Sequence, residues 1–394
     1  MSKGDATYIK ALNRRNLIEK IIEHCAISRI ELSRLTGLNR STVSTQINQL
    51  MQEGLIIEGP SEISKGGRKP ILLQMNEDAG FTIGIDIDMP TTQIQVTNLL
   101  GKPVQTYRYT HDKDTIDEST SGMIQFIEEI ITEVKKKLSP VGLVGIGIGI
   151  HGIVDNDHDI VYTPTLQRIQ MSLKEEMEHA FGVPIYIDNN ANLSVYAEQV
   201  LNFPIEDLFT ITMYSGIGLG IIEDNSIYRG FQGFAGEIGH MIVERGGLEC
   251  PCGNNGCWEL YASERALVKN LESKGIDGSE LEHADANELL THYPEIIHDY
   301  LDYFAVGLNN IINIFNPETL IINSPFLRKR QELLDQLRER LNSRMNNYDK
   351  LVISALGKNA CSLGGAMIAL KNYYEIKTLN LNGYRYFEEQ LVEN

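Results

Sequence analysis

The sequence predicts an α/β protein made of a small N-terminal winged helix-turn-helix and a large body with two lobes. Three observations support this prediction. Two short amphipathic segments joined by a glycine-containing turn lie between residues 28 and 52. Glycine-rich apolar strands recur from Phe81 onward. A chain of 394 residues is also too long for one ordinary core. We expect residues 1–76 to form the first part and residues 77–394 the second, with a cleft between its lobes.

Composition and hydropathy indicate a soluble globular protein. Hydrophobic residues make up 42% of the chain and charged residues 22%. No run of about 18 uninterrupted apolar residues is present, so we expect no membrane span. The first residues lack the apolar core of a signal peptide. We therefore expect a cytoplasmic protein, in which thiols stay reduced and disulfides are disfavoured.

The charge is distributed unevenly along the chain. The whole chain carries a net charge of -18, yet residues 1–70 hold 11 basic and 7 acidic residues. The head is therefore basic, and the body holds all of the acidic excess. This asymmetry fits a nucleic-acid-binding module joined to a sensor or an enzyme. The alternative is an ordinary solvated face, and charge alone does not decide between the two.

The basic head shows the pattern of a helix-turn-helix. Apolar residues recur at helical spacing over Leu12–His24, which predicts a first helix. Ser28 and Glu31 form a capping-box pair at the start of a second helix, which ends near Gly37. A third helix is predicted from about Ser41 to Gln52. We expect one shared apolar face built from Ile30, Leu35, Leu38, Val43, Ile47 and Leu50.

The third helix is the expected DNA-reading element. Its exposed start carries polar side chains suited to phosphates and base edges in the major groove, namely Arg40, Ser41, Thr42, Ser44, Thr45 and Gln46. Residues 55–75 predict two strands around a turn, a wing. Arg68 and Lys69 at its tip are expected to contact the DNA backbone or a narrow minor groove. The alternative is a generic three-helix bundle with a basic linker.

The body contains two similar units, and each of them is predicted to begin with a hairpin. Alternating residues from Phe81 to Val104 predict the first hairpin, with a turn at Met89–Pro90. Val141–Asp155 is nearly continuous in apolar residues, as in a strand buried on both faces. A second glycine-rich hairpin follows at residues 208–230. Residues 259–316 are predicted to be mainly helical, and residues 315–326 return to a strand. This repetition predicts an internally duplicated α/β body.

Two loops of the body have alternative interpretations. Ser215–Gly220 contains glycines that let backbone N–H groups approach phosphate, or that form a hairpin turn. Ile187–Asn192 follows a strand end, where α/β proteins place ligand contacts. Its amides and carboxylate suit sugar hydroxyls, or they cap the next helix. The residue pattern leaves both choices open.

The cysteine cluster predicts a structural zinc site. Cys250, Cys252 and Cys257 lie within eight residues, and His240 lies ten residues before the first of them. Three thiolates and one imidazole form a closed tetrahedral set with no position for a catalytic water. Cys25 and Cys361 are isolated and are expected to be packing residues.

Carboxylates border the predicted zinc loop. Glu237 precedes His240 by three residues, and Glu259 follows Cys257 by two. The cluster has acidic neighbours and lacks the spacing of a zinc finger, so we do not expect it to read DNA. Carboxylates beside a metal-held loop suit vicinal sugar hydroxyls, with the metal as scaffold. The alternative is that both glutamates are ordinary solvated surface.

At this point the motifs resemble a known family. The stretches "GFAGEIGHMIVE" and "CPCGNNGCWE" resemble the signature of the ROK family, which includes repressors, open reading frames and kinases. The similarity extends from the helix-turn-helix through "GGRKP" to "ACSLGGAMIAL". The stretches "SRIELSRLTGLNRSTVSTQINQLM" and "GCWELYASERALVK" are most similar to the xylose-repressor branch from Gram-positive bacteria.

The resemblance has specific implications. It implies a sugar-kinase/actin-like body of two lobes, structural zinc on His240 and the three cysteines, and a homodimer or higher homo-oligomer. It also implies that His240 serves both sites, with one ring nitrogen on zinc and the other toward the sugar. The family's sugar contacts carry over onto Asn189, Asn190, Glu237, His240 and Glu259.

Three departures from the family's kinases argue against catalysis. Asp88 and Met89 stand in "DIDMPT" where the kinases have phosphate-binding glycines. Asn190 replaces the aspartate that serves as general base, and an amide cannot accept the sugar's proton. Asn323–Pro325 replaces a pair of glycines on the adenosine side. We therefore expect no enzymatic activity.

The sequence thus predicts a transcriptional repressor of sugar-utilisation genes, with xylose as the first candidate effector. It would bind a palindromic operator as a dimer and be released when sugar enters the cleft. Two alternatives are an ATP-dependent sugar kinase with a vestigial DNA-binding head, and a repressor that responds to a phosphosugar or a protein signal.

Overall fold

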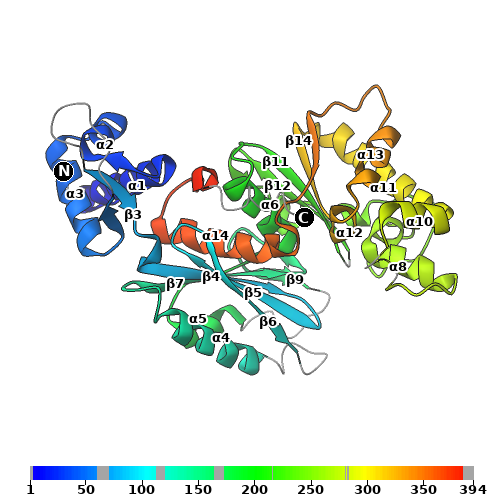
Figure 1. Cartoon of the computed structure of the whole chain (residues 1–394), viewed down its shortest axis with the longest axis horizontal. Helices are drawn as coiled ribbons and strands as arrows, with labels where there is room; N and C mark the ends of the chain where they lie inside the picture. The colour runs from blue at the N-terminus through cyan, green and yellow to red at the C-terminus, as the bar shows by residue number, and fades with distance from the viewer. Residues whose placement is uncertain are drawn as a thin grey trace. The chain divides into compact units, whose positions relative to one another are not determined.

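The chain forms two compact units in the computed structural model, which describes residues 3–59, 71–111, 120–163, 173–214, 216–279, 281 and 284–384 (Figure 1). The first unit comprises Met1–Leu193, Gln199–Pro204 and Cys361–Asn394. The second comprises Ser194–Glu198 and Ile205–Ala360. The predicted DNA-binding head therefore packs with one lobe of the body, and the other lobe forms a unit of its own.

The head contains the three predicted helices and a small sheet. Ser28 caps the second helix, where its hydroxyl oxygen accepts the Glu31 N–H at 3.2 Å. Asn39 caps the third helix by accepting the Thr42 N–H at 2.8 Å, so this helix begins at Arg40. The sheet has the order β1-β3-β2. These elements are α1 (Lys3–His24), β1 (Ile27–Ser28), α2 (Arg29–Thr36), α3 (Arg40–Gln52), β2 (Ile56–Glu58) and β3 (Leu72–Met75).

The expected apolar face of the helix-turn-helix is only partly correct. Val43, Ile47 and Leu50 on α3 are buried, as predicted. Ile30 and Leu35 are 63% and 40% exposed, so their assignment to this face is wrong. The reason is the length of α2, because an eight-residue helix presents one narrow face to the core, and Leu32 occupies it.

The body part of the first unit is a five-stranded sheet with the order β10-β7-β4-β5-β6. Strands β4, β5 and β6 form an antiparallel meander, and β7 and β10 add to it in parallel. Helices α4 and α5 cover one face of the sheet and α14 covers the other (Figure 1). The strands are β4 (Gly80–Ile87), β5 (Thr91–Asn98), β6 (Pro103–Thr110), β7 (Gly142–Ile150) and β10 (Ile185–Asn189). The other elements are α4 (Thr120–Val134), β8 (Ile153–Val154), β9 (Ile160–Tyr162), α5 (Leu173–Phe181), α6 (Asn190–Leu201) and α14 (Ala360–Tyr374). The middle of α6, Ser194–Glu198, and the first residue of α14 are grouped with the second unit.

The alternation of isoleucine and glycine in β7 explains the two different faces of this sheet. Ile146, Ile148 and Ile150 are buried in one core cluster with side chains of α4 and α5. Gly147 lies on the opposite face, where a Cβ would overlap the carbonyl of Gly365 in α14. The backbones of strand and helix are therefore in direct contact, which only glycine permits here.

The second unit repeats the topology of the first. Its sheet has the order β13-β12-β11-β14-β15, again an antiparallel meander followed by two parallel additions. The predicted internal duplication is therefore confirmed. Its strands are β11 (Leu208–Met213), β12 (Ile217–Glu223), β13 (Ser226–Ile227), β14 (Thr319–Asn323) and β15 (Lys350–Ile353).

A helical layer packs on this second sheet, as predicted for residues 259–316. Trp258 is fully buried in its core, and its indole N–H donates to the Tyr303 carbonyl at 2.8 Å. The long helix α11 lies against the indole at Gly307. The helices are α7 (Glu259–Ala262), α8 (Glu264–Ser273), α10 (Ala286–His292), α11 (Pro294–Phe315), α12 (Pro325–Arg328) and α13 (Gln331–Arg340).

Two glycine-rich stretches lie mainly in regular secondary structure. The "LGGA" stretch lies inside α14, where Gly364 and Gly365 provide close backbone contacts. The "SGIGLG" stretch begins at Ser215, which lies outside the described residues. Its residues Ile217–Gly220 belong to β12. β11 ends at Met213 and β12 begins at Ile217, so most of this motif is strand.

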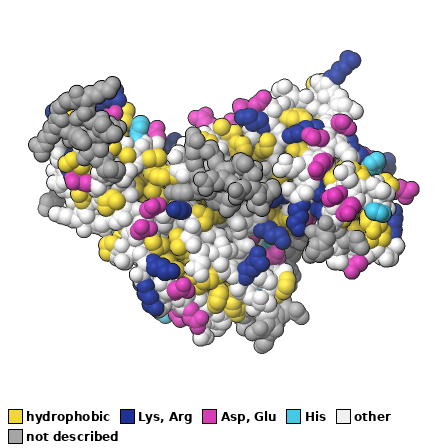
Figure 2. Space-filling model, viewed as in Figure 1, with side chains coloured by type: hydrophobic (Ala, Val, Ile, Leu, Met, Phe, Trp, Pro, Cys, Tyr) yellow, Lys and Arg dark blue, Asp and Glu magenta, His cyan; other side chains and the backbone are white. Residues whose placement is uncertain are grey.

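The head and the body are joined by a short connection. β3 ends at Met75 and β4 begins at Gly80, on either side of the domain boundary expected at residue 76. In the described part of the chain, no helix is long and apolar enough to cross a membrane. On the face shown in Figure 2, hydrophobic side chains are interspersed with charged ones.

The contact between α14 and α6 yields a stability prediction. A Cβ at Gly364 would overlap the Leu193 carbonyl oxygen of α6, so Gly364→Ala should destabilise the protein by about 1–3 kcal/mol. Gly145→Ala is the matched control, since its Cβ would meet nothing closer than 3.3 Å. Chemical denaturation of both variants measures the difference. Equal stability of the two would contradict the close helix–helix contact.

Candidate functional site

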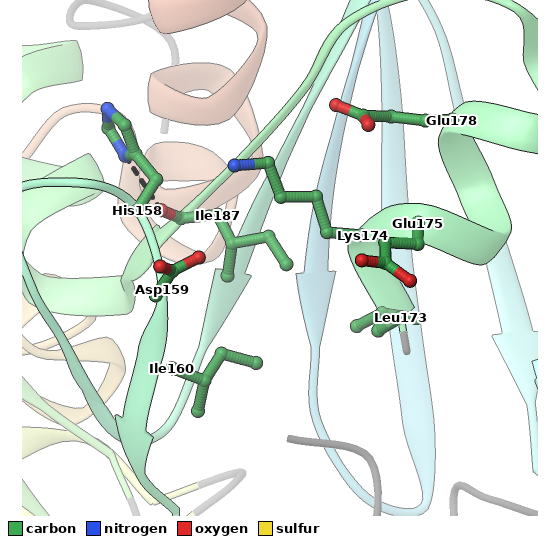
Figure 3. A pocket seen from close by; sticks show the side chains of 8 residues that line it. All are labelled: His158, Asp159, Ile160, Leu173, Lys174, Glu175, Glu178 and Ile187. Carbon is green, nitrogen blue, oxygen red and sulfur yellow. Dashed lines mark hydrogen bonds between the residues drawn. The ribbon is translucent and has the colours of Figure 1, made fainter. Parts of the chain in front are cut away.

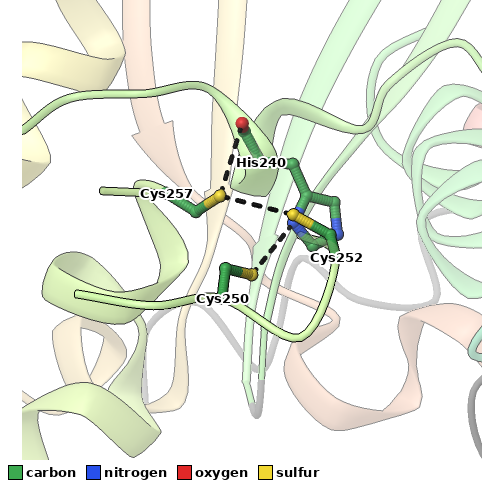
Figure 4. Close-up of side chains that lie close together, drawn as sticks. All are labelled: His240, Cys250, Cys252 and Cys257. Atoms are coloured by element: carbon green, nitrogen blue, oxygen red, sulfur yellow. Dashed lines mark hydrogen bonds between the residues drawn. The ribbon is translucent and has the colours of Figure 1, made fainter. Parts of the chain in front are cut away.

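The predicted metal ligands converge in the second unit. The side chains of His240, Cys250, Cys252 and Cys257 place one ligand atom each within 4.8 Å of one another (Figure 4). The loop from Cys250 to Cys257 turns through Gly253 and Gly256, both with positive φ. Glycine tolerates this conformation, which lets the chain fold around one point.

The spacing of the ligand atoms fits a tetrahedral zinc ion. Zinc bonds of about 2.3 Å to sulfur and 2.0–2.1 Å to nitrogen place tetrahedral ligand atoms roughly 3.5–3.8 Å apart. The Cys252 and Cys257 sulfurs are 3.6 Å apart. The Cys250 sulfur is 3.6 Å from His240 Nδ1. The donor set and its geometry therefore suit the structural zinc predicted from the sequence.

The thiols of this cluster have different surroundings. Burial raises the pKa of the Cys250 thiol to about 12, and burial also raises the pKa of Cys257. The Asn254 backbone N–H lowers the pKa of the more exposed Cys252. A zinc ion binds thiolates, so metal binding at this cluster must release protons.

Two carboxylates flank the imidazole of His240. Its Nδ1, which faces Cys250, is also 3.7 Å from Glu259 Oε1. Its Nε2 is 3.8 Å from Glu237 Oε2. One ring nitrogen therefore faces the metal ligands and the other faces Glu237. This arrangement fits the expectation that His240 serves two sites.

Glu259 is the more buried of the two carboxylates. Its side chain is 14% exposed and begins α7, whereas that of Glu237 is 41% exposed. A Cβ at Gly216 would lie 3.0 Å from Glu259 Oε2, so a glycine leaves room for this carboxylate. Partial burial raises the pKa of Glu237, which His240 opposes and Glu259 reinforces. Neither glutamate is an isolated, fully solvated surface charge.

The two predicted asparagines lie in the first unit, where β10 meets α6. Asn189 Oδ1 accepts the Ala191 N–H at 2.7 Å, and its Nδ2 donates to the Gly152 carbonyl at 2.7 Å. The helix-capping interpretation of this loop therefore holds for Asn189. Asn190 is the first residue of α6, and its amide lies 3.2 Å from His151 Nδ1.

A histidine that sequence analysis missed completes this part of the site. His151 lies between Asn190 and Asp88, with Nε2 at 3.7 Å from Asp88 Oδ1. It directly follows β7, which pairs in parallel with β10. The signal was available, because the carboxyl ends of adjacent parallel strands meet at one sheet edge.

The positions that depart from the kinase pattern have local roles. Asp88 Oδ1 accepts the N–H of Met89 at 2.8 Å and places a carboxylate in the turn after β4. Asn323 is buried at the end of β14, where it accepts from the Tyr214 hydroxyl and donates to the Gly357 carbonyl. These side chains occupy positions where the kinase pattern has only backbone.

The predicted DNA-contacting residues mostly lie at the accessible start of α3. Arg40, Ser41 and Thr45 are exposed, and Thr42 and Ser44 are partly exposed. Gln46 is an exception and a correction. It is 5% exposed, and its amide donates to the Lys10 carbonyl of α1, so it packs inside the head. The wing residues Arg68 and Lys69 lie outside the described residues.

A separate pocket of about 270 Å³ lies in the first unit. Figure 3 shows Lys174, Glu175 and Glu178 projecting from α5, with Lys174 extending toward His158. Asp159, Ile160, Leu173 and Ile187 complete its lining. None of the predicted sugar contacts lines this pocket.

The fold and the site together define a class: a winged helix-turn-helix joined to a duplicated sugar-kinase-like body whose loop carries a His/Cys cluster suited to a metal. Family comparison agrees with this class. Residues 82–372 match the ROK family, and residues 10–57 match a winged helix-turn-helix DNA-binding domain. The chain belongs to the ROK family.

Three relatives place the chain more closely. The xylose repressor of Bacillus subtilis (strain 168) is 36% identical over 96% of this chain and 100% of its own length. The crystal structure of a ROK family transcriptional regulator, a homologue of the Escherichia coli MLC protein, superposes with a TM-score of 0.78 at 22% identity, covering 96% and 99% of the two chains. A ROK family glucokinase from Streptomyces griseus, in complex with glucose and AMPPNP, gives a TM-score of 0.60 at 25% identity, covering 73% and 99%.

Mutation of one cysteine of the proposed metal site should remove bound zinc and reduce stability. Cys257→Ser should remove bound zinc and lower the stability of the second unit by at least about 2 kcal/mol, a Tm decrease of roughly 4–8 °C. Metal analysis by atomic absorption and thermal unfolding measure both effects. Cys25→Ser, which changes a cysteine outside the cluster, should keep the zinc and the Tm. Full zinc content in Cys257→Ser would exclude this ligand set.

Removal of the Glu259 carboxylate, beside the cysteine loop, should weaken sugar binding. Glu259→Ala removes charge-assisted hydrogen bonds and should weaken sugar binding by roughly 10- to 150-fold. Glu249→Ala is the control, since it changes an exposed glutamate of the same loop. Calorimetric titration with xylose compares the two variants. Unchanged affinity in Glu259→Ala would remove this residue from the site.

Proposed function

We propose that this protein is a DNA-binding transcriptional repressor of sugar-utilisation genes that a sugar releases from its operator. Two features together support this proposal most strongly. The first turn of α3 presents accessible polar side chains, and the sugar-kinase-like site has an amide, Asn190, in place of a general base. The B. subtilis relative, similar over nearly the full chain, is named a xylose repressor, which supports xylose as the effector.

The proposed sugar contacts are carboxylates, an imidazole and an amide. Glu237, His240 and Glu259 supply two carboxylates and an imidazole, which accept and donate to sugar hydroxyls. Asn190 supplies an amide at the start of α6, and Asn189 positions it by capping that helix. Structural zinc on His240 and the three cysteines would hold the loop from which the acidic contacts project, without taking part in a reaction.

The proposal assigns no catalytic activity. Phosphoryl transfer needs a base for the sugar hydroxyl, and an amide at Asn190 cannot accept that proton. The carboxylate of Asp88 adds negative charge where the triphosphate of ATP would bind. The structural similarity to a glucokinase is what supports the kinase alternative, and both substitutions oppose it.

The remaining parts of the proposal concern DNA and assembly. A homodimer or higher homo-oligomer in the cytoplasm would present two heads to a palindromic operator, with the head at residues 1–76 and the sensing body at residues 77–394. Arg40, Ser41, Thr42, Ser44 and Thr45 are the proposed DNA contacts of α3, and Arg68 and Lys69 those of the wing.

A titration with xylose tests the proposal. At fixed salt, saturating xylose should weaken operator binding by about 5- to 150-fold, the range of typical allosteric coupling. Fluorescence anisotropy of a labelled operator duplex measures the change, and a coupled assay should detect no ADP formation with xylose or glucose. A response to a phosphosugar alone would replace the effector, and sugar-dependent ADP formation that Asn190→Ala abolishes would establish the kinase alternative.

A further inference from the structure

Helix α14 connects two functionally distinct regions of the first unit. Its 15 residues span about 22 Å. Near its start, a Cβ at Gly364 would overlap the carbonyl oxygen of Leu193, the fourth residue of α6. Asn190, a proposed sugar contact, begins that same helix. A backbone contact this close allows little sliding, so α6 and α14 must move together.

The far end of α14 contacts the DNA-binding head. The guanidinium of Arg15 in α1 donates to the Glu375 carboxylate, with Nε at 2.9 Å and a second, shorter contact from Nη2. Tyr373 lies nearby, and burial raises its pKa while Arg14 lowers it and Glu53 raises it. Arg14 is itself paired with Glu53, the C-cap of α3, at 2.7 Å. The end of α14 thus contacts α1, and α1 is in turn paired with the C-cap of α3 through Arg14 and Glu53.

The backbone at this end is unfavourable for the residue it carries. Glu375 has a φ of +53°, the left-handed conformation in which glycine is favoured. The Glu375 N–H donates to the Asn372 carbonyl and the Ile376 N–H to the Lys371 carbonyl, which is a Schellman ending of the helix. Glycine would end this helix with less strain. A glutamate here retains a carboxylate for Arg15 in spite of the strained backbone.

The segment after α14 strengthens the same connection. The Leu381 N–H donates to the Val200 carbonyl at 2.9 Å, and Asn382 donates to the carbonyls of Leu201 and Asn202. These carbonyls lie in the last turn of α6 and directly after it. A Cβ at Gly383 would lie 3.2 Å from the sulfur of Cys25, directly after α1. Both ends of α6 therefore contact α14 or its continuation.

We propose that α14 transmits the state of the sugar site from α6 to the DNA-binding head, and that the Arg15–Glu375 pair is the coupling contact. This inference rests on the proposed function. Sugar binding at Asn190 would shift α6, and α14 would carry that shift to α1 and α3. The two paired side chains are positioning residues that touch neither sugar nor DNA.

Variants at the pair test this coupling. Glu375→Gly removes the carboxylate and relieves the backbone, so the variant should fold, bind xylose normally and bind operator normally without sugar. The fold-change in operator affinity caused by xylose should fall about two- to fivefold, the range expected from a surface ion pair. Arg15→Gln should do the same, and the exchanged pair Arg15→Glu with Glu375→Arg should restore the coupling.

A matched control separates coupling from backbone relief. Asn316 ends α11 in the second unit with a φ of +46°, so Asn316→Gly relieves the same kind of strain away from the head. It should leave the xylose effect unchanged. Wild-type coupling in both Glu375→Gly and Arg15→Gln would overturn the proposal, because the signal would then pass through another connection such as residues 76–79.

Hydrogen exchange with operator DNA alone provides a readout that does not depend on the effector. In the wild-type protein, operator binding should change exchange in residues 371–384 and at the start of α6 as well as in the head. In Glu375→Gly the change should be confined to the head. If xylose does not bind, the assignment of xylose fails while this readout still decides the coupling. If operator binding changed hydrogen exchange only in the head of the wild-type protein, the inference would be overturned.

Discussion

The backbone contact between α14 and the sheet of the first unit is the constraint on which the rest of that unit depends. Gly147 meets Gly365, and Gly84 meets the Ser362 carbonyl, at distances that exclude any Cβ. Isoleucines on the other face of β7 supply the core with α4 and α5. Strand β7 is therefore tightly constrained on both faces. Its carboxyl end, which His151 follows, is held beside Asn189 and Asp88. Asn190, the proposed sugar contact at the start of α6, thus rests on a rigid base.

In the second unit, the proposed metal site would take the equivalent role. The four ligand atoms of His240 and the three cysteines lie within 4.8 Å of one another. A bound ion would fix His240, which already lies beside Glu259. In the proposed function, His240 is the one residue shared between sugar recognition and the metal, and the carboxylates contact only the sugar. Asn190 would offer hydrogen bonding without proton transfer, as a sensor requires.

Much of the fold could be predicted from the sequence, because periodicity and caps are local signals. Ser28 and Gly37 marked the limits of α2, and the repeated hairpins indicated the duplication. The convergence of His240 with the three cysteines was predictable from their spacing. The burial of Gln46 was not, because it depends on the approach of α1 to α3. The close contacts of Gly364 and Gly365 were not predictable either, because they depend on the strand and helix that pack against α14. His151 was overlooked because a single histidine carries no periodicity.

The central claim is that sugar and operator bind in a mutually opposing way, and thermodynamic reciprocity tests it most directly. If xylose weakens operator binding by some factor, operator must weaken xylose binding by the same factor. Calorimetric titration of xylose into the free protein and into the protein saturated with operator duplex measures the second factor. Xylose should bind more weakly in the presence of operator. The fold-change in xylose affinity should equal the fold-change that xylose causes in operator affinity. Identical xylose affinities in the two titrations would contradict it.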